Sequence, residues 1–380
     1  MRIFLLFILL LFSACTAAPP DKEKLPLVLE AADYGDLPGW KKDDHAAVLA
    51  ALTRSCERIL KRPVDQAFGP DGIGGVYGDW QPACRDLPNV KQGQAREFFE
   101  RWFTPYKATT EEAGSESLFT GYYEPMLRGA KTRQGPYTVP LHTRPVDLVM
   151  VDLGEFRDEL KGQRIAGRVI DAHLKPYEDR AKIVEGSWPY NDNVLVWVDD
   201  PVDAFFLHIQ GSGRVELPDG KEIRVGYDGQ NGHVYYAIGR ELIRRGFMEK
   251  NEVSLQSIRK WLDDHPGDAA EIMNLNRSYV FFKELKEEGP LGGEGVALTP
   301  ERSLAVDRSK IPYGVPLWVD IESPVDGEPG LRRLMMAQDT GGAIRGAVRG
   351  DVFWGHGERA EHLAGYMKAK GRYWLLLPKR

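Results

Sequence analysis

The sequence predicts a mainly β protein with accessory helices. Its 380 residues include 40 glycines and 25 prolines, a content that favours short strands joined by turns over a helical bundle. From residue 118 onward, short apolar runs alternate with glycine and proline, and this spacing is typical of a barrel or a sandwich. A chain of this length can form two domains, each with its own core.

The chain begins with a leader of the lipoprotein type. A basic residue precedes an apolar run that is too short to span a bilayer but suits the core of a signal peptide. The run ends in Ser13-Ala14-Cys15, where small residues precede a cysteine. We therefore expect a signal peptide over residues 1–15, lipidation of Cys15, and a polar tether over residues 16–26. Phe12 stands where leucine is usual, so cleavage as an ordinary secreted protein remains the alternative.

Two further cysteines, Cys56 and Cys84, are available for a disulfide. In an oxidising periplasm an even pair of cysteines is naturally bonded, and this pairing is our prediction. Two buried free thiols are the alternative, because a sequence does not give the distance between two side chains.

Five segments have the periodicity or the flanking residues of helices. We expect Asp43 or Asp44 to cap the first helix, Asn231 the third and Ser254 the fourth, and Gly371 to end the last. The segments are residues 45–61, 95–103, 234–245, 255–264 and 358–370.

Short apolar runs bounded by glycine or proline predict the strands. A further strand is expected to begin at Asp351, where the side chain of Phe353 would share the face of the carboxylate. The other runs are residues 118–123, 137–141, 194–198, 204–210, 279–282, 316–321, 334–337 and 372–377.

Composition and motif spacing argue against several functional classes. The net charge is -6 and no Lys/Arg cluster with interleaved aromatics occurs, so we expect no nucleic-acid partner. The 8 histidines are scattered, and His356 and His362 lack the spacing that puts two ligands on one helical face, so we expect no metal. The turn at Ser212, Gly-Ser-Gly, lacks the lysine and helix of a phosphate-binding loop, and we expect no cofactor.

Three aspartates are candidate site residues because each lies at the end of a strand-like run and next to a turn: Asp307, Asp339 and Asp351. Carboxylates are the usual acids and bases for cleaving glycosidic bonds. Asp339 opens the turn Asp-Thr-Gly-Gly, where backbone N–H groups would stabilise the ionised form. Asp351 would lie beside Phe353, and apolar cover raises the pKa of a carboxyl, as a general acid requires. On pattern alone, all three aspartates could instead only satisfy turns.

Two glycine-containing segments are candidate sugar-binding elements. Thr120 and Gly121 would let a sugar approach the backbone, and Tyr122 offers a stacking surface with a hydrogen-bonding tip. Gln210 and Ser212 lie on a second glycine turn, and their polar groups suit carbohydrate hydroxyls.

Motifs along the chain together resemble one known family. In order, over residues 118–377, they look like the membrane-bound lytic murein transglycosylase A family, whereas the first hundred residues match only loosely. The motifs are Phe119-Thr-Gly-Tyr-Tyr123, Gln210-Gly-Ser-Gly213, Asn231-Gly-His233, Tyr279-Val-Phe-Phe-Lys283, Ala305-Val-Asp-Arg-Ser309 and Asp339-Thr-Gly-Gly-Ala-Ile-Arg-Gly346 with Asp351.

The resemblance implies a double-psi β-barrel domain, an inserted second β domain, and a groove between them for a glycan strand. A helical segment and the first part of the barrel would cover residues 27–124, the insert residues 125–285, and the rest of the barrel residues 286–380. The groove would be lined by Thr120, Gly121 and Tyr122 on one side and by Gln210 and Ser212 on the other.

The same resemblance implies a peptidoglycan lytic transglycosylase of cell-wall turnover. It would cleave the β-1,4 bond between N-acetylmuramic acid and N-acetylglucosamine and form 1,6-anhydro-N-acetylmuramic acid. The family's catalytic aspartate falls on Asp351, and its two other recurrent aspartates fall on Asp339 and Asp307. One carboxylate suffices because the C6 hydroxyl of the muramic acid attacks in place of water.

Two other functions remain open from the sequence. One is a hydrolase of the same barrel type, in which Asp339 or Glu124 works beside Asp351 and water is the nucleophile. The other is a non-catalytic peptidoglycan-binding lipoprotein that kept the groove.

The expected location is the periplasmic face of the outer membrane. Thr16 follows the lipidated cysteine, and in similar Gram-negative lipoproteins a residue other than aspartate there implies the outer membrane. The expected partners are glycan strands, the outer membrane through the lipid anchor, and cell-wall synthesis proteins. If the protein is secreted without lipid, the periplasm is the alternative location.

Overall fold

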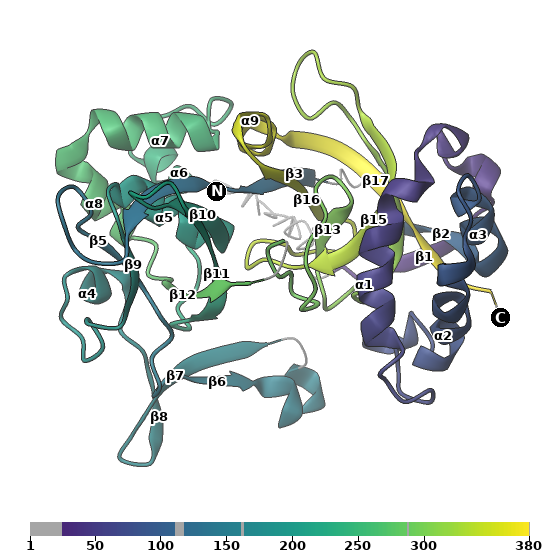
Figure 1. The fold of residues 1–380 in the computed structure, drawn as a ribbon, viewed down its shortest axis with the longest axis horizontal. Helices are drawn as coiled ribbons and strands as arrows, with labels where there is room; N and C mark the ends of the chain where they lie inside the picture. The colour runs from purple at the N-terminus through teal and green to yellow at the C-terminus, as the bar shows by residue number, and fades with distance from the viewer. Residues whose placement is uncertain (1–24, 111–117, 161–162, 287–288, 380) are drawn as a thin grey trace, which may run out of the picture.

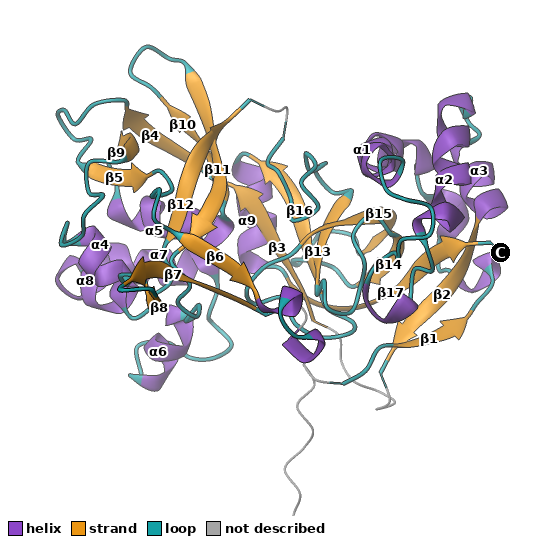
Figure 2. Cartoon of the chain, turned by 90° about the horizontal axis from the view of Figure 1, so that it is seen from below, coloured by secondary structure: helices purple, strands orange, loops and turns teal. Residues whose placement is uncertain are grey.

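The computed structural model describes residues 25–110, 118–160, 163–286 and 289–379. The predicted signal peptide with Cys15, and the tether up to residue 24, lie outside the described residues. Within the described part of the chain, no helix is long and apolar enough to cross a membrane. The molecule has three parts along its length, with N-terminal helices at one end, a barrel in the middle and the inserted β domain at the other end (Figures 1 and 2).

Six strands close into the central barrel. The ring runs β3–β16–β13–β15–β14–β17 and returns to β3, because residues 368–370 of β17 pair with residues 118–120 of β3. The β3–β16 and β13–β15 pairs are parallel and the others are antiparallel. This confirms the mainly β fold class and agrees with the double-psi barrel expected. The strands are β3 (Leu118–Glu124), β13 (Ser303–Val306), β14 (Pro316–Ile321), β15 (Leu331–Asp339), β16 (Gly350–His356) and β17 (Lys368–Pro378).

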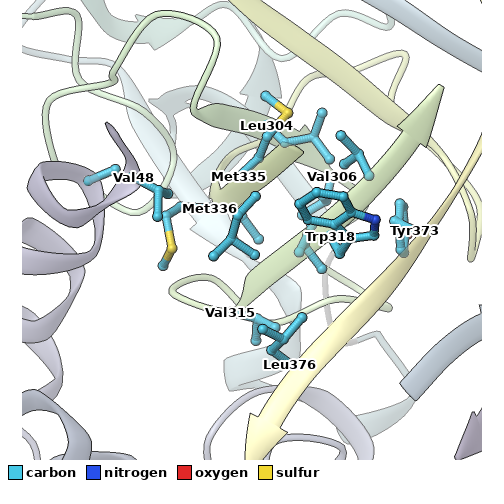
Figure 3. Close-up of a cluster of buried hydrophobic side chains, with 14 of the residues drawn as sticks. Val48, Leu304, Val306, Val315, Trp318, Met335, Met336, Tyr373 and Leu376 are labelled. Carbon is cyan, nitrogen blue, oxygen red and sulfur yellow. The ribbon is translucent and has the colours of Figure 1, made fainter. Parts of the chain in front are cut away.

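Strands β13 and β14 are buried on both faces, because the N-terminal segment covers part of the outside of the barrel. In β14 the side chains of Leu317, Trp318 and Val319 are all fully buried, although neighbouring side chains point to opposite faces. The Trp318 ring packs edge-on against Trp40, with ring centroids 5.0 Å apart. Figure 3 shows buried side chains of β13, β14, β15 and β17 together with Val48 from the N-terminal segment. Burial on both faces explains why these strands are continuous apolar runs in the sequence.

The N-terminal helices pack beside β1 (Val28–Ala31) and β2 (Phe103–Thr109), which extend the barrel sheet beyond β17 (Figure 1). The helix predicted at 45–61 is present as a 3-10 turn (His45–Val48) followed by α1 (Leu49–Ile59), and Asp44 caps it by accepting from the N–H of Ala46 at 3.1 Å. The helix predicted at 95–103 is α3 (Ala95–Trp102).

Helix α2 (Tyr77–Asp86) was not predicted, because Gly78 and Pro82 inside it are poor helix formers. Tertiary packing overrides this local preference, since Trp80 is buried and its ring stacks on Phe68 with centroids 4.3 Å apart. A disulfide joins Cys56 of α1 to Cys84 of α2, with a Cα–Cα distance of 5.2 Å.

In the described part of residues 126–285 there are two further sheets and five α-helices. The larger sheet has the order β12-β11-β10-β4-β9-β5, and the smaller one the order β6-β7-β8. The strands are β4 (Met126–Ala130), β5 (Val139–His142), β6 (Val149–Asp152), β7 (Arg164–Ile170), β8 (His173–Pro176), β9 (Val194–Val198), β10 (Ser212–Glu216), β11 (Glu222–Gln230) and β12 (Val280–Leu285). The helices are α4 (Arg180–Val184), α5 (Pro201–Gln210), α6 (Ile238–Arg244), α7 (Leu255–Asp264) and α8 (Pro266–Asn274).

The strand predicted at residues 204–210 is wrong, because these residues belong to helix α5. The carboxylate of Asp200 accepts from the N–H groups of Val202 and Asp203, Pro201 occupies the first turn, and Gly211 ends the helix at a φ of 79°. The segment is almost entirely apolar and lies buried between a sheet and helices. In such a segment neither helical nor strand periodicity is visible in the sequence.

Two predicted helix ends also differ from the structure. The helix expected from residue 234 begins only at Ile238, and Asn231 does not cap it. Its side chain instead donates to the carbonyls of Glu178 and Arg277 and accepts from the N–H of Tyr279. The last helix, α9 (Glu358–Tyr366), stops before residue 370 because β17 starts at Lys368 and pairs with β3. By contrast, Ser254 caps α7 as predicted.

Candidate active site

The carboxylate of Asp351 lies beside Thr120 at the edge of the barrel. The two residues are register partners on the parallel strands β16 and β3. The Thr120 hydroxyl donates to Oδ1 of Asp351 at 2.7 Å, and Arg349 Nη2 donates to the Thr120 hydroxyl oxygen at 2.7 Å. Because arginine only donates, it orients the threonine proton towards the carboxylate.

Burial raises the pKa of Asp351 to about 6, against the opposing effects of the Arg349 charge and the Thr120 hydrogen bond, while the charge of Asp339 raises it further. Phe353 lies two residues further along the same strand, and its ring centroid is 5.2 Å from that of Tyr122. Some of the Asp351 surface remains accessible. A carboxyl of this kind can hold a proton near neutral pH and still reach a ligand.

Asp339 is on β15 and Asp351 is on β16, and strand β13 lies between these two strands in the barrel. Ala305 of β13 is the register partner of Asp351 on one side and of Asp339 on the other. Oδ1 of Asp339 accepts from the N–H groups of Thr340 and Gly293, both at 2.8 Å, and Oδ2 accepts from the Tyr122 hydroxyl at 2.6 Å. Burial raises the pKa of Asp339 and these hydrogen bonds lower it. The bond from Thr340 was predicted from the turn, but the one from Gly293 was not.

Asp307 holds two loops of the barrel together. It is 2% exposed, Oδ1 accepts from the N–H and the hydroxyl of Ser309 at 3.0 and 2.7 Å, and Oδ2 accepts from the N–H of Gly346 at 2.8 Å. With both oxygens occupied in the interior, this carboxylate connects the turn after β13 to the loop before β16.

Gly121 is a glycine because α9 and Trp354 approach it closely. A Cβ atom on this residue would lie 2.5 Å from Nε1 of Trp354 and 2.9 Å from the Cα of Ala364. The sequence motif predicts that a sugar approaches the backbone at this glycine. In the structure, the space that a Cβ atom would need is already filled by Trp354 and α9, and this packing explains the glycine. Contact of Gly121 with sugar remains a prediction.

Gln210 and Ser212 belong to the inserted part of the chain and meet the barrel at β3. Oε1 of Gln210, the last residue of α5, accepts from the N–H of Tyr123 at 3.1 Å. Ser212, the first residue of β10, is 9% exposed. The structure therefore brings the segment of Gln210 next to the segment of Thr120 and Tyr122, as the two sides of one site would require.

Glu124, a second catalytic carboxylate in the hydrolase alternative, is held in ion pairs. It is 2% exposed, and one of its oxygens lies 2.6 Å from Arg224 Nη2 and 3.8 Å from Arg214 Nε. A buried carboxylate paired with two arginines from the adjacent sheet joins the barrel to the insert. It is not placed to act as a free base.

Arg349 and Glu294 are site-associated residues that the sequence analysis did not identify. Neither lies in a recognisable motif, and the i, i+2 spacing of Arg349 and Asp351 on a strand was the only signal for the first. Glu294 accepts from the hydroxyl of Ser55 at 2.7 Å next to Gly293, and burial raises the pKa of Glu294 to about 7. In the described part of the chain, no group of three or more His, Cys, Asp or Glu side chains is arranged to hold a metal ion.

The closed barrel, the carboxyl at its edge and the inserted β domain define a class of mainly β proteins with an acidic site where two β domains meet. Two family models match the chain in these regions. Residues 118–283 match the MltA specific insert domain, and residues 302–377 match the 3D domain.

Solved structures show the same architecture over nearly the whole chain. The crystal structure of a membrane-bound lytic murein transglycosylase from Agrobacterium tumefaciens is 31% identical, with a TM-score of 0.81 over 92% of this chain and 97% of that one. MltA from Neisseria gonorrhoeae is 35% identical, with a TM-score of 0.76 over 93% of each chain. The chain therefore belongs to the membrane-bound lytic murein transglycosylase A family.

Curated relatives match over a shorter region. Membrane-bound lytic murein transglycosylase A of Escherichia coli K12 is 33% identical over 265 residues, which are 68% of this chain and 65% of the relative. The match thus spans just under two thirds of the length of that protein. A crystal structure of E. coli MltA with bound chitohexaose is 27% identical, with a TM-score of 0.66 over 94% of this chain and 95% of that one.

Proposed function

We propose that this protein is a peptidoglycan lytic transglycosylase in which Asp351 is the single general acid and base. The observation that carries the proposal is the carboxyl of Asp351, which is largely buried but partly accessible. Burial raises its pKa to about 6, and the Thr120 hydroxyl donates a hydrogen bond to it. Support comes from the names of the relatives and from the chitohexaose bound in one of them.

In the first step, the Asp351 carboxyl donates its proton to the glycosidic oxygen. The bond from C1 of N-acetylmuramic acid to that oxygen breaks, and N-acetylglucosamine leaves with a free 4-hydroxyl. In the second step, the Asp351 carboxylate accepts the proton of the C6 hydroxyl of the muramic acid. The O6 oxygen of the same sugar then bonds to C1. The product is a 1,6-anhydro ring, no water is consumed, and Asp351 regains its proton.

The surroundings of the other carboxylates fit a one-carboxylate mechanism. Asp339 is engaged by three donors and Glu124 by two arginines, so neither is positioned to activate a water molecule. The negative charge of Asp339 would instead stabilise the positive charge that develops at C1. Its effect on the pKa of Asp351 helps to keep the acid protonated. Asp307 supports the site by holding the loops.

The glycan would bind where the inserted domain meets the barrel. Tyr122 is fixed by its bond to Asp339, and Gln210 approaches β3 from the other side. In this proposal residues 27–124 and 286–380 form the barrel domain, residues 125–285 form the inserted domain, and the groove lies between them. The residues that contact sugar are Thr120, Gly121, Tyr122, Gln210 and Ser212.

Product mass distinguishes the proposed reaction from hydrolysis. Purified peptidoglycan digested with the wild-type protein should give muropeptides with 1,6-anhydro ends, which are 18 Da lighter than reducing ends because no water is added. Asp351→Asn should abolish release while sacculi are still bound. Reducing ends would favour the two-carboxylate hydrolase, and lysis retained by the variant would overturn the assignment. A wild type that binds without cleaving would favour the non-catalytic lipoprotein.

We also propose a periplasmic, membrane-associated location, because the relatives are named membrane-bound. The anchor would be a lipid on Cys15, in the outer membrane. Cys15→Ser should move the protein from the membrane fraction to the soluble periplasmic fraction. The opposite result, in which the variant stays with the outer membrane, would contradict a lipid anchor at this residue.

A further inference from the structure

A cavity of about 390 Å³ lies in the inserted part of the chain. Its walls come from β5, α4, α5, α7 and α8, and no residue of the barrel lines it. The volume is within the range of small-molecule sites. Most of the wall is apolar, with Val139, Phe205, Leu262 and Met273 among the lining residues.

Arg180 brings a buried positive charge to the wall of this cavity. Its side chain is 3% exposed, Nε donates to the carbonyl of Asn276 at 2.9 Å, and Nη2 donates to the carbonyl of Ser278 at 2.6 Å. Among the described residues, no carboxylate forms an ion pair with it and its Nη1 has no acceptor. A buried guanidinium without an anion is costly, so the site favours a ligand that supplies one.

His208 places a second donor next to Arg180. Its Nδ1 accepts from the N–H of Val280 at 3.1 Å, so the neutral ring carries its proton on Nε2. Within the described part of the chain this N–H has no acceptor. Both side chains contact the same ring, since the Tyr279 centroid lies 4.2 Å from the His208 ring and 5.4 Å from Cζ of Arg180. One cationic and one neutral donor therefore share a wall, an arrangement that suits a carboxylate.

We propose that this cavity binds the C-terminal carboxylate of a short peptide with small aliphatic side chains. Arg180 and His208 would bind the carboxylate, and the apolar walls would enclose the side chain. Asn274 and Asp263 also line the cavity, with acceptors for peptide N–H groups, and this favours a peptide over a simple fatty acid. Asp200, the other acidic lining residue, caps α5 through its Oδ1.

Matched ligands test the charge and the peptide separately. N-acetyl-alanyl-alanine, its C-terminal amide and octanoate would each be titrated into the whole protein by calorimetry. We expect saturable binding of the acid, and binding at least about tenfold weaker for the amide and for octanoate. Equal binding of acid and amide, or no binding of the acid, would overturn the carboxylate site, and equal binding of octanoate would overturn a peptide as the ligand.

Variants on α8 test the location. Ala270 is exposed and lines the cavity, so Ala270→Trp should obstruct it without disturbing the core, and should weaken binding at least about tenfold. Asp268→Trp, an exposed position on the same helix that does not line the cavity, should bind as the wild type does. Arg180→Met should also lose binding, but Arg180 holds two backbone carbonyls, and Ala270→Trp avoids that structural risk. Undiminished binding by Ala270→Trp would refute the proposal.

Discussion

The hydroxyl of Thr120 donates a 2.7 Å hydrogen bond to the carboxylate of Asp351 from the adjacent parallel strand. The two residues are 231 positions apart in the chain, yet the register of β3 and β16 puts them side by side. The bond favours the ionised carboxylate and thus opposes the burial that raises the pKa of Asp351. Removing the Thr120 hydroxyl should therefore raise the pKa of the proposed acid, Asp351.

Thr120→Val should move the alkaline limit of activity to higher pH. Valine keeps the shape of the side chain but loses the hydrogen bond that lowers the pKa of Asp351. Because the first step needs a protonated acid, the activity of the wild type should fall as pH rises through about 6. The activity of the variant should fall at a higher pH. The pH dependence of kcat/KM on purified peptidoglycan measures this limit. Thr53→Val, at an exposed threonine of α1, serves as the control.

Asp339→Asn should move the same limit in the opposite direction. The charge of Asp339 raises the pKa of Asp351, so its loss lowers that pKa and activity should decline at lower pH than in the wild type. The amide oxygen can still accept from Gly293 and Thr340, and its NH2 group can donate to Tyr122. The maximal rate should fall by about 100-fold if the charge stabilises the transition state. A limit that moves upward, or not at all, would count against the coupling.

Replacing both cysteines by alanine should destabilise the protein by about 3 to 4 kcal/mol, given the 28-residue separation of Cys56 and Cys84. The bond joins two helices that cover the barrel, and its loss restores conformational freedom to the unfolded chain. Urea unfolding measures the change. A reducing agent should lower the stability of the wild type towards that of the variant and leave the variant unaffected. Equal stability of both proteins under oxidising conditions would contradict this expectation.

Glu294→Gln should remove the part of the loss of stability that arises as pH rises from 4.5 to about 7. Burial raises the pKa of Glu294 from 4.5 to about 7, so between these values the folded state binds more protons than the unfolded state. Stability from this residue is present below pH 4.5 and is lost as pH rises towards 7.

The free energy of unfolding of Glu294→Gln, relative to that of the wild type, should therefore increase between pH 4 and pH 8 by up to about 3 kcal/mol. Urea unfolding at both pH values checks this. Glu97→Gln, at an exposed glutamate of α3, should show no such change.

The parts of the fold that were predicted correctly are those governed by local chemistry. Ser254 caps α7 because its side chain reaches an N–H three residues on, and glycine and proline bound the strands because they set the backbone at turns. The aspartates were found in the same way, because each lies at or next to the end of a strand. What the sequence did not reveal is which donors each carboxylate has, because these come from distant segments.

The chain by itself determined the helix caps at Asp44 and Ser254, most strands and the family motifs, since each depends on neighbouring residues or on their order. The bond between Cys56 and Cys84 was one of two alternatives until the structure brought the two residues together. Only the tertiary structure decided that residues 204–210 are a helix, because an apolar segment buried on all sides shows no periodicity. It also decided that Glu124 pairs with arginines, and that Gly293, 46 residues away, donates to Asp339. The acid–base character of Asp351 belongs to this second group, because burial and charges are properties of the assembled barrel and not of a motif.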